Sequence, residues 1–365
     1  MLMYFVAFGI AFVGVFALTP LARLIALRVG ALDIPEDRKV HLRETPTLGG
    51  LAIYASTLLG IGIYLAFSGH PLTTNLIGIL AGATIIVAFG AADDIHTLGP
   101  LVKLFGQILA AGIPVIMGVQ IQNIRIPGTP IVSLSPELSV VVSLVWIVAF
   151  MNIINLIDGL DGLAAGITCI AAFSMFYYSS QTGVGKTYVD AALISIVLAG
   201  STLGFLRYNF YPASVFMGDS GSMLLGFLLG TATIQGVLKS IAAVALLVPV
   251  LALFIPILDT GMAIVRRGLR GTPITHADKE HIHHRLLAMG HSQRQAVLLL
   301  YFWTALFCGA GVAIKFAGKN KGFWIVFALA FVGFALTAFP RLVRGENPKG
   351  KHRASRKKTD EDVHG

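Results

Sequence analysis

Charged side chains are scarce in this sequence. Only 12% of its 365 residues are Asp, Glu, Lys or Arg, whereas 56% are hydrophobic. Soluble globular domains have about a quarter of their residues charged, so the composition excludes an ordinary soluble protein. The sequence predicts an integral membrane protein.

Cysteine is also nearly absent. The chain has two, Cys169 and Cys308, and both lie within apolar stretches. A disulfide is therefore not expected, and these residues leave the redox compartment of the protein undetermined.

Long apolar runs, by contrast, are abundant. A helix needs about 20 mostly apolar residues to cross the hydrocarbon core of a bilayer. The first run has no basic segment before it and no cleavage-site pattern, so we expect it to stay as a spanning helix. We expect an all-α polytopic fold with about eleven transmembrane helices, at residues 2–19, 48–67, 76–92, 101–119, 138–157, 160–179, 188–206, 218–238, 240–262, 295–315 and 321–339.

The basic residues predict the orientation of these helices. Lys and Arg concentrate on the cytoplasmic side of membrane proteins. An outer N-terminus and a cytoplasmic C-terminus place most of the 27 Lys and Arg inside. The net charge of +9 then reflects topology and attraction to anionic headgroups, so no nucleic acid partner is expected. Residues 1–340 are expected to form a single transmembrane domain, followed by a basic, disordered tail at 341–365.

Polar residues interrupt the apolar runs at 151–166, which read MNIINLIDGLDGLAAG. Asn152, Asn155 and Asp158 recur every third residue and would share one slowly rotating stripe of a helix. Asp161 is placed to cap the next helix, which would begin at Gly162. These residues could act only as caps and interhelical contacts. Carboxylates near a membrane are costly, however, which favours a metal-phosphate or nucleoside site.

Two further acidic clusters fall on the same expected cytoplasmic side. Asp93 and Asp94 would point about 100° apart on a helix, which predicts different roles for the two carboxylates, with Lys103 as a candidate counter-ion. Asp219 lies between glycines in FMGDSGS, just before an apolar run. A helix N-terminus there favours phosphate, and one carboxylate suits Mg²⁺. The alternatives are a helix end that carries Asp by chance and an ordinary Asp-Ser-Gly cap.

Two basic segments complete the pattern. The first segment contains three histidines and an arginine, and we expect their imidazole and guanidinium groups to bind a pyrophosphate. A zinc site and a solvated loop are the alternatives. The second segment lies in the first inner loop, and its basic residues can be explained by the positive-inside rule alone. The residues of the first segment are His281, His283, His284 and Arg285, and those of the second are Arg38, Lys39, His41 and Arg43.

Together these segments resemble the polyprenyl-phosphate N-acetylhexosamine-1-phosphate transferases. The resemblance extends from about residue 30 to 300, with its motifs in family order and apolar spans between them. It rests on RKVH with TPTLGG (38–50), DDIHTLGPLVKLFGQ (93–107), NIINLIDGLDGLAAGI (152–167), FMGDSGS (216–222) and HIHHRL (281–286).

The resemblance implies a reaction that depends on Mg²⁺, with Mn²⁺ as a substitute, at the cytoplasmic face of a bacterial inner membrane. A lipid phosphate attacks the β-phosphorus of a UDP-amino sugar, and UMP leaves. The product would start cell-envelope polymers such as lipopolysaccharide or teichoic acid. The histidine motif is similar to that of the N-acetylglucosamine branch, which implies UDP-GlcNAc and undecaprenyl phosphate as substrates; a homodimer is compatible with this pattern.

The family motifs also imply roles for individual residues. The acids linked to activation of the lipid phosphate are Asp93 and Asp94, and the Mg²⁺ ligands are Asp219 and Asn152. The nucleotide-sugar pocket is implied to contain Asn155, Asp158 and Asp161, with Phe216 stacked on uracil. The remaining substrate-binding residues are Lys103, Arg38, Lys39, His41, His281, His283, His284 and Arg285.

Several alternatives stay open at this stage. The same chemistry could act on UDP-MurNAc-pentapeptide or UDP-GalNAc. A secondary transporter would also have many spans, but its ionisable groups should lie near the bilayer midplane. Asp158-Asp161-Gly162 also begins the signature of CDP-alcohol phosphotransferases, but Gly166 stands where that family has Arg. Within the favoured family, Asp93 or Asp94 could act as a base or could form a phospho-enzyme.

Overall fold

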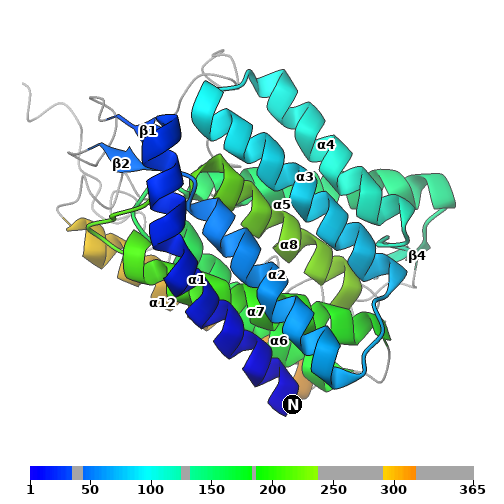
Figure 1. The fold of residues 1–365 in the computed structure, drawn as a ribbon. Coiled ribbons are helices and arrows are strands. Elements are labelled where there is room, and N and C mark those ends of the chain that lie inside the picture. The colour runs from blue at the N-terminus through cyan, green and yellow to red at the C-terminus, as the bar shows by residue number, and fades with distance from the viewer. Residues whose placement is uncertain (35–43, 125–131, 183–185, 237–290, 318–365) are drawn as a thin grey trace, which may run out of the picture. The chain divides into compact units, whose positions relative to one another are not determined.

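A computed structural model describes residues 1–34, 44–124, 132–182, 186–236 and 291–317, all within one compact unit that spans Met1–Asn320. The described chain is helical, apart from two short antiparallel hairpins (Figure 1). Leu32–Asp33 (β1) pairs with Thr45–Pro46 (β2), and Asn123–Ile124 (β3) pairs with Val132–Ser133 (β4).

Nine of the predicted spans coincide with helices. These are α1 (Leu2–Val29), α2 (Gly49–Ser68), α3 (Thr74–His96), α4 (Pro100–Ile116), α5 (Pro136–Ile157), α6 (Leu163–Thr182), α7 (Lys186–Asn209), α8 (Gly218–Gly236) and α12 (Gln293–Ala317). The spans predicted at 240–262 and 321–339, and the domain boundary at residue 340, lie outside the described residues.

The helices have the length and composition of membrane spans. Six of those described, α1, α2, α3, α5, α6 and α7, are long and apolar enough to cross a bilayer, whereas α4 is shorter. The protein is therefore a helical, polytopic membrane protein. The total of about eleven spans and the orientation of the termini stay predictions.

Helix α1 continues beyond its predicted end at residue 19. It runs through Pro20 to Val29 and is capped by Gly30, which adopts a left-handed conformation with φ 74°. A proline has no N–H, so the carbonyl of Phe16, four residues earlier, lacks its usual helical donor. The hydroxyl of Tyr208 donates a hydrogen bond to that carbonyl at 3.0 Å. This contact satisfies the free carbonyl and ties α1 to the end of α7.

Small residues let α1, α2 and α7 pack with their backbones close together. A Cβ placed on Gly60 of α2 would lie 3.0 Å from the carbonyl oxygen of Ala7. On α7, a Cβ at Gly200 would lie 2.5 Å from the oxygen of Phe8, and one at Gly204 would lie 2.6 Å from the oxygen of Phe12. Small residues at helix interfaces are a general means of packing in membranes, where burial from water contributes little.

Helix α8 is the most enclosed helix of the described part of the chain. All residues from Ser220 to Gly236 are buried, and α8 contacts α2, α3, α5, α6 and α7. Its first turn approaches two other backbones closely, because a Cβ on Gly50 would lie 2.2 Å from the nitrogen of Gly221 and one on Gly90 would lie 2.4 Å from the Cα of Ser220. The start of α8 is therefore fixed against α2 and α3.

The segment before α2 is bound to the segment before α8. The N–H of Phe216 donates to the carbonyl of Pro46 at 2.8 Å, and the N–H groups of Gly49 and Gly50 donate to the carbonyls of Phe216 and Met217 at 3.0 and 2.9 Å. Leu48, between them, has φ 69°, a conformation that non-glycine residues rarely adopt. Three backbone hydrogen bonds thus hold the approach to α8.

A second polar cluster lies at the other end of α2 and α7. The carboxylate of Asp190 in α7 accepts a hydrogen bond from Thr73 Oγ1 at 2.6 Å and lies 2.8 Å from Nε2 of His70. His70 and Thr73 belong to the connection between α2 and α3. This cluster joins three helices at the end away from Asp94 and Asp219.

Substitution of Gly200 by Ala tests the close packing of α1 on α7. The added Cβ would force apart two backbones, and overpacking of this kind costs about 1–3 kcal/mol. We expect Gly200→Ala to lower the thermal midpoint of the purified protein in detergent.

Gly62→Ala is the matched control, because Gly62 is also a helical glycine but an added Cβ meets no described atom within 4 Å. Equal midpoints for the two variants would contradict the packing described for α7.

Candidate active site

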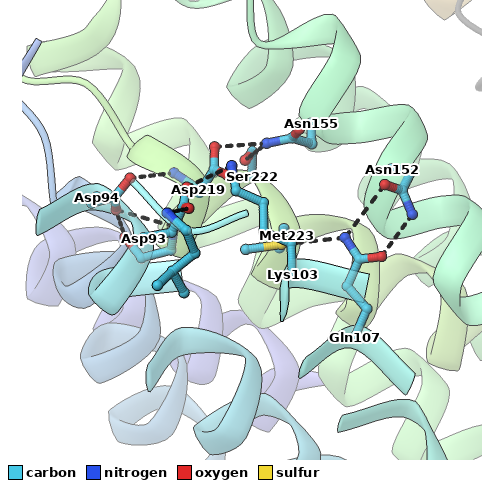
Figure 2. Close-up of polar contacts among 11 residues, drawn as sticks. Asp93, Asp94, Lys103, Gln107, Asn152, Asn155, Asp219, Ser222 and Met223 are labelled. Carbon is cyan, nitrogen blue, oxygen red and sulfur yellow. Dashed lines mark hydrogen bonds and ion pairs between the residues drawn. The ribbon is translucent and has the colours of Figure 1, made fainter. Parts of the chain in front are cut away.

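Asp94 joins the end of α3 to the start of α8. Its Oδ1 accepts the backbone N–H of Asp219 at 2.7 Å, and its Oδ2 accepts the N–H of Ser220 at 3.2 Å and the hydroxyl of Ser220 at 2.7 Å (Figure 2). Gly218 has φ 68°, and a Cβ there would lie 2.4 Å from Oδ2 of Asp94. Asp94 therefore caps α8 from another helix, where the helix dipole favours a negative charge.

This arrangement corrects one prediction. The first N–H groups of α8 were expected to bind a substrate phosphate, whereas two of them are bound to the carboxylate of Asp94. The same contact explains how a carboxylate is tolerated in the last turn of α3, since the N-terminus of α8 offsets the unfavourable dipole of α3.

Asp93 and Lys103 form the neighbouring ion pair. Asp93 is 8% exposed; its Oδ1 accepts the N–H of Leu98 at 2.6 Å, and its Oδ2 lies 2.6 Å from Nζ of Lys103. Nζ of Lys103 also lies 2.7 Å from Oδ2 of Asp219. The two adjacent carboxylates of α3 thus point to different partners, as the helical geometry predicts, and Lys103 is the counter-ion of Asp93.

Asp219 receives a second contact from α5. The side-chain amide of Asn155 donates to Oδ1 of Asp219 and to the hydroxyl of Ser222, both at 2.9 Å. Both oxygens of Asp219 therefore have a protein donor, yet each oxygen of a carboxylate can accept more than one contact. Asp219 lies in the first turn of α8 and stays partly exposed.

Asn152 lies one helical turn before Asn155 and has different partners. Its amide nitrogen donates to Oε1 of Gln107 and to the carbonyl of Val148, both at 2.8 Å. The amide nitrogen of Gln107 lies 3.4 Å from Oδ1 of Asn152 and 3.4 Å from the sulfur of Met223. The contact to Asp219 is thus made by Asn155, which the resemblance assigns to the nucleotide, rather than by Asn152.

Gln107 is the last residue of the motif at 93–107, but it was not among the predicted site residues. It is 3% exposed and joins α4, α5 and α8 through one side chain. Its spacing could have found it, because residues four apart lie on the same face of a helix and Lys103 precedes it by four.

The loop between α5 and α6 is held by a third set of contacts. Asp161 accepts the N–H of Ala213 at 2.8 Å, and Gly162 rather than Asp161 occupies the N-cap position of α6, because the carbonyl of Gly162 accepts the N–H of Gly166. A buried amide, Asn209, accepts the N–H of Gly162 at 3.1 Å and donates to the carbonyl of Val215 at 3.1 Å.

Tyr301 of α12 adds to this loop. Its hydroxyl donates to the carbonyl of Gly162, and its ring occupies the space that a Cβ on Gly166 would need. Asn209 and Tyr301 were not among the predicted site residues, and no local motif marks either of them. Their contacts fix the loop that carries Asp158 against the segment that carries the half-buried Phe216.

Asp158 differs from the other acids of the site. Among the described residues its carboxylate has no hydrogen bond or ion pair. Burial raises the pKa of Asp158 to about 8, and the negative charges of Asp219, Asp94, Asp161 and Asp33 act in the same direction. A carboxyl group with this pKa is largely protonated at neutral pH and can donate a hydrogen bond.

The predicted site residues of the two basic segments lie outside the described residues. They are Arg38, Lys39, His41, His281, His283, His284 and Arg285.

The donor set is compatible with Mg²⁺. No group of three or more His, Cys, Asp or Glu residues that could hold a metal occurs within the described ranges. Mg²⁺, however, uses one or two protein carboxylates and completes its octahedron with water and phosphate oxygens. The ammonium of Lys103 already bridges Asp93 and Asp219, so a positive charge is accommodated at this position. Asp219 fits the role of the ligand.

Comparison with known proteins shows which family the chain is similar to. Residues 76–237, which include Asp93, Asp94, Asn155 and Asp219, match the family model described as "Glycosyl transferase family 4". A protein of Bacillus subtilis (strain 168) named "Probable undecaprenyl-phosphate N-acetylglucosaminyl 1-phosphate transferase" is 38% identical over 324 residues, which cover 89% of this chain and 88% of the relative.

Two further relatives show how far the similarity extends. The decaprenyl-phosphate N-acetylglucosaminephosphotransferase of Mycolicibacterium smegmatis is 38% identical and covers 88% of this chain and 85% of its own length. The phospho-N-acetylmuramoyl-pentapeptide-transferase of the same organism is 30% identical, over 86% of this chain and 97% of its own length. With this coverage and the matching motifs in place, the chain belongs to glycosyl transferase family 4, the polyprenyl-phosphate N-acetylhexosamine-1-phosphate transferases.

Proposed function

We propose that the protein transfers GlcNAc-1-phosphate from UDP-GlcNAc to a polyprenyl phosphate such as undecaprenyl phosphate. UMP would be released, and the polyprenyl-diphospho-GlcNAc product would start a cell-envelope polymer. The observation that carries the proposal is the convergence of Asp93, Asp94, Lys103, Asn155 and Asp219 around the first turn of α8. The relatives that are 38% identical, which carry N-acetylglucosamine in their names, support this sugar.

The reaction we propose is a direct displacement. An oxygen of the lipid phosphate attacks the β-phosphorus of UDP-GlcNAc, the bond from that phosphorus to the bridging oxygen breaks, and the electron pair leaves with UMP. A phosphate monoester is mostly ionised at neutral pH, since its second pKa is about 6, so the attacking group needs little help from a base. Phosphoryl transfer depends chiefly on positioning and on neutralisation of charge.

The contacts of the two acids of α3 support this route over a phospho-enzyme. Both oxygens of Asp94 accept hydrogen bonds from α8, and attack by Asp94 would remove the cap of that helix. Asp93 is bound to the N–H of Leu98 and to Lys103. Both carboxylates are therefore better placed to organise the site than to act as nucleophiles.

Mg²⁺ held by Asp219 would neutralise charge on the diphosphate, and Mn²⁺ is the expected substitute. Asn155 holds Asp219 in place, and Asp158, Asp161 and Phe216 belong to the proposed nucleotide pocket. In that pocket, a protonated Asp158 could donate a hydrogen bond to an oxygen of the nucleotide. Asn152 is a second proposed ligand through Oδ1, which lies 3.4 Å from the amide nitrogen of Gln107.

We also propose a cytoplasmic active site in the inner membrane, with about eleven spans, an outer N-terminus and a cytoplasmic C-terminus. The basic residues Arg23 and Arg28 lie near the end of α1, and Arg207 lies in the last turn of α7. The C-terminal ends of α1 and α7 lie toward the segments that carry the acids of the site. The positive-inside rule therefore favours a cytoplasmic position for this end of the helices.

Release of UMP tests the function directly. The purified protein in detergent, supplied with undecaprenyl phosphate, Mg²⁺ and UDP-GlcNAc, should release UMP, and the release should require the lipid. UDP-GalNAc and UDP-MurNAc-pentapeptide, assayed with the same preparation, should react at least about ten times more slowly, a difference of about 1.4 kcal/mol in the barrier. Preference for the pentapeptide substrate would overturn the assignment of the sugar.

Asp219→Asn tests the proposed metal ligand. Loss of this negative charge should reduce UMP release by about 100-fold or more, because it removes charge stabilisation at the reacting phosphate. The thermal midpoint should change little, since Asn can still accept from Asn155.

Glu137→Gln is the control, because Glu137 lies in the first turn of α5, at the far end from Asn155, and the same charge is removed there. Full activity of the Asp219→Asn variant would refute the assignment.

The raised pKa of Asp158 predicts a pH dependence of stability. The ordinary pKa is 3.8 and that in the folded protein is about 8, so the folded state binds the proton more tightly than the unfolded chain. The free energy of unfolding should therefore fall as the pH rises from about 4 to about 8. Asp158→Asn should remove this component, so the thermal midpoint of the metal-free variant should fall less over that range. Identical pH profiles would show that Asp158 titrates normally.

A further inference from the structure

Lys103 connects two carboxylates that come from different helices. Its ammonium lies 2.6 Å from Oδ2 of Asp93 in α3 and 2.7 Å from Oδ2 of Asp219 in α8. Without a positive charge between them these two carboxylates would repel each other. Lys103 therefore offsets part of the negative charge that Asp93 and Asp219 bring to the site.

A divalent cation on Oδ2 of Asp219 would disturb this pair. Oδ1 of Asp219 is bound to Asn155 and Oδ2 to Lys103. Mg²⁺ binds carboxylate oxygens at about 2.0–2.1 Å, so an ion on Asp219 and an ammonium on the same oxygen would repel each other at close range.

The carboxylates near Lys103 differ in the contacts that they would keep if its ammonium moved away from Asp219. Asp93 keeps the N–H of Leu98 as a second partner and can retain the ammonium. Lys103 is about one-third exposed, and its flexible stem allows the ammonium to move. Asp94 has no such freedom, because its oxygens are committed to the first turn of α8.

We propose that Lys103 is a resident counter-cation of Asp219 which a divalent metal ion displaces, and that the released ammonium then binds a phosphate of the substrates. The proposal rests on the metal role given to Asp219 under the proposed function. Metal binding and the arrival of a positive charge beside the reacting phosphates are thereby linked. Until a metal ion displaces it, Lys103 would stay on Asp219 and would not be available to an anionic substrate.

The same face of α4 also contacts Asn152, the other proposed metal ligand. Gln107, four residues after Lys103, is bound to Asn152 through an amide pair with one contact of 2.8 Å. Residues of α4 thus contact both residues that the family resemblance assigns to the metal.

The proposed displacement of Lys103 can be tested by measuring the binding of Mn²⁺ to the full-length protein in detergent, without substrates. Bound Mn²⁺ is measured by the loss of the electron paramagnetic resonance signal of free Mn²⁺. Lys103→Met should bind Mn²⁺ about 3- to 10-fold more tightly than the unchanged protein, because a competing charge is removed. Mg²⁺ alone should also raise the thermal midpoint of this variant more than that of the unchanged protein. UMP release should nevertheless fall by about 10-fold or more, because no ammonium is left for the phosphate.

Arg207→Met controls for the change in net charge, since Arg207 is exposed in the last turn of α7. Its affinity for Mn²⁺ should equal that of the unchanged protein. Lys103→Arg keeps the positive charge and serves if Lys103→Met fails to fold; its affinity should be unchanged or weaker, because a guanidinium holds carboxylates firmly.

Unchanged or weaker binding by Lys103→Met, or tighter binding by Lys103→Arg, would overturn the proposal. Absence of Mn²⁺ binding to the unchanged protein, together with normal UMP release, would overturn it and leave the transfer reaction intact. Tighter binding by Lys103→Met without UMP release from the unchanged protein would support the exchange and refute the proposed function.

Discussion

The capping of α8 by Asp94 is the interaction on which the site depends. The carboxylate of Asp94, at the end of α3, accepts hydrogen bonds from N–H groups in the first turn of α8. The negative end of the α3 dipole therefore lies beside the positive end of the α8 dipole. Such an arrangement requires the two helix ends to approach within hydrogen-bond distance, and Gly90 and Gly218 make that approach sterically feasible. Asp219 owes its position to this junction, because it is the residue whose N–H Asp94 binds.

Charge balance then determines what surrounds the junction. Three carboxylates, those of Asp93, Asp94 and Asp219, lie near one helix end, and each is stabilised by a different set of contacts. Asp94 is stabilised by backbone N–H groups, whereas Asp93 and Asp219 share Lys103. Only the support of Asp219 comes largely from side chains that can move, namely Lys103 and Asn155. This difference separates a structural carboxylate from one that can change partners.

Much of the fold was predictable because hydropathy decides which segments enter a bilayer. The positions of the nine described helices and the polar clusters at their ends follow from that rule. The exact ends do not: α1 passes Pro20 because a distant tyrosine replaces the missing hydrogen bond. In the site, the divergence of Asp93 and Asp94 follows from helical geometry, but the capping of α8 by Asp94 depends on tertiary contact. Asn209 and Tyr301 were missed for the same reason, since their partners are remote in sequence, whereas the helical spacing from Lys103 could have identified Gln107.

If α4 spans the bilayer, as the sequence predicts, its short length has a consequence for the bilayer itself. At 17 residues it is about 25 Å long, less than the hydrocarbon thickness of about 30 Å, and its outer face exposes Leu101, Phe105 and Ile108. Lipids beside a helix that is too short are accommodated by local thinning. Headgroups next to α4 would then sit deeper than elsewhere, at the level of its first turn, so a lipid substrate could meet Lys103 without being lifted out of its leaflet.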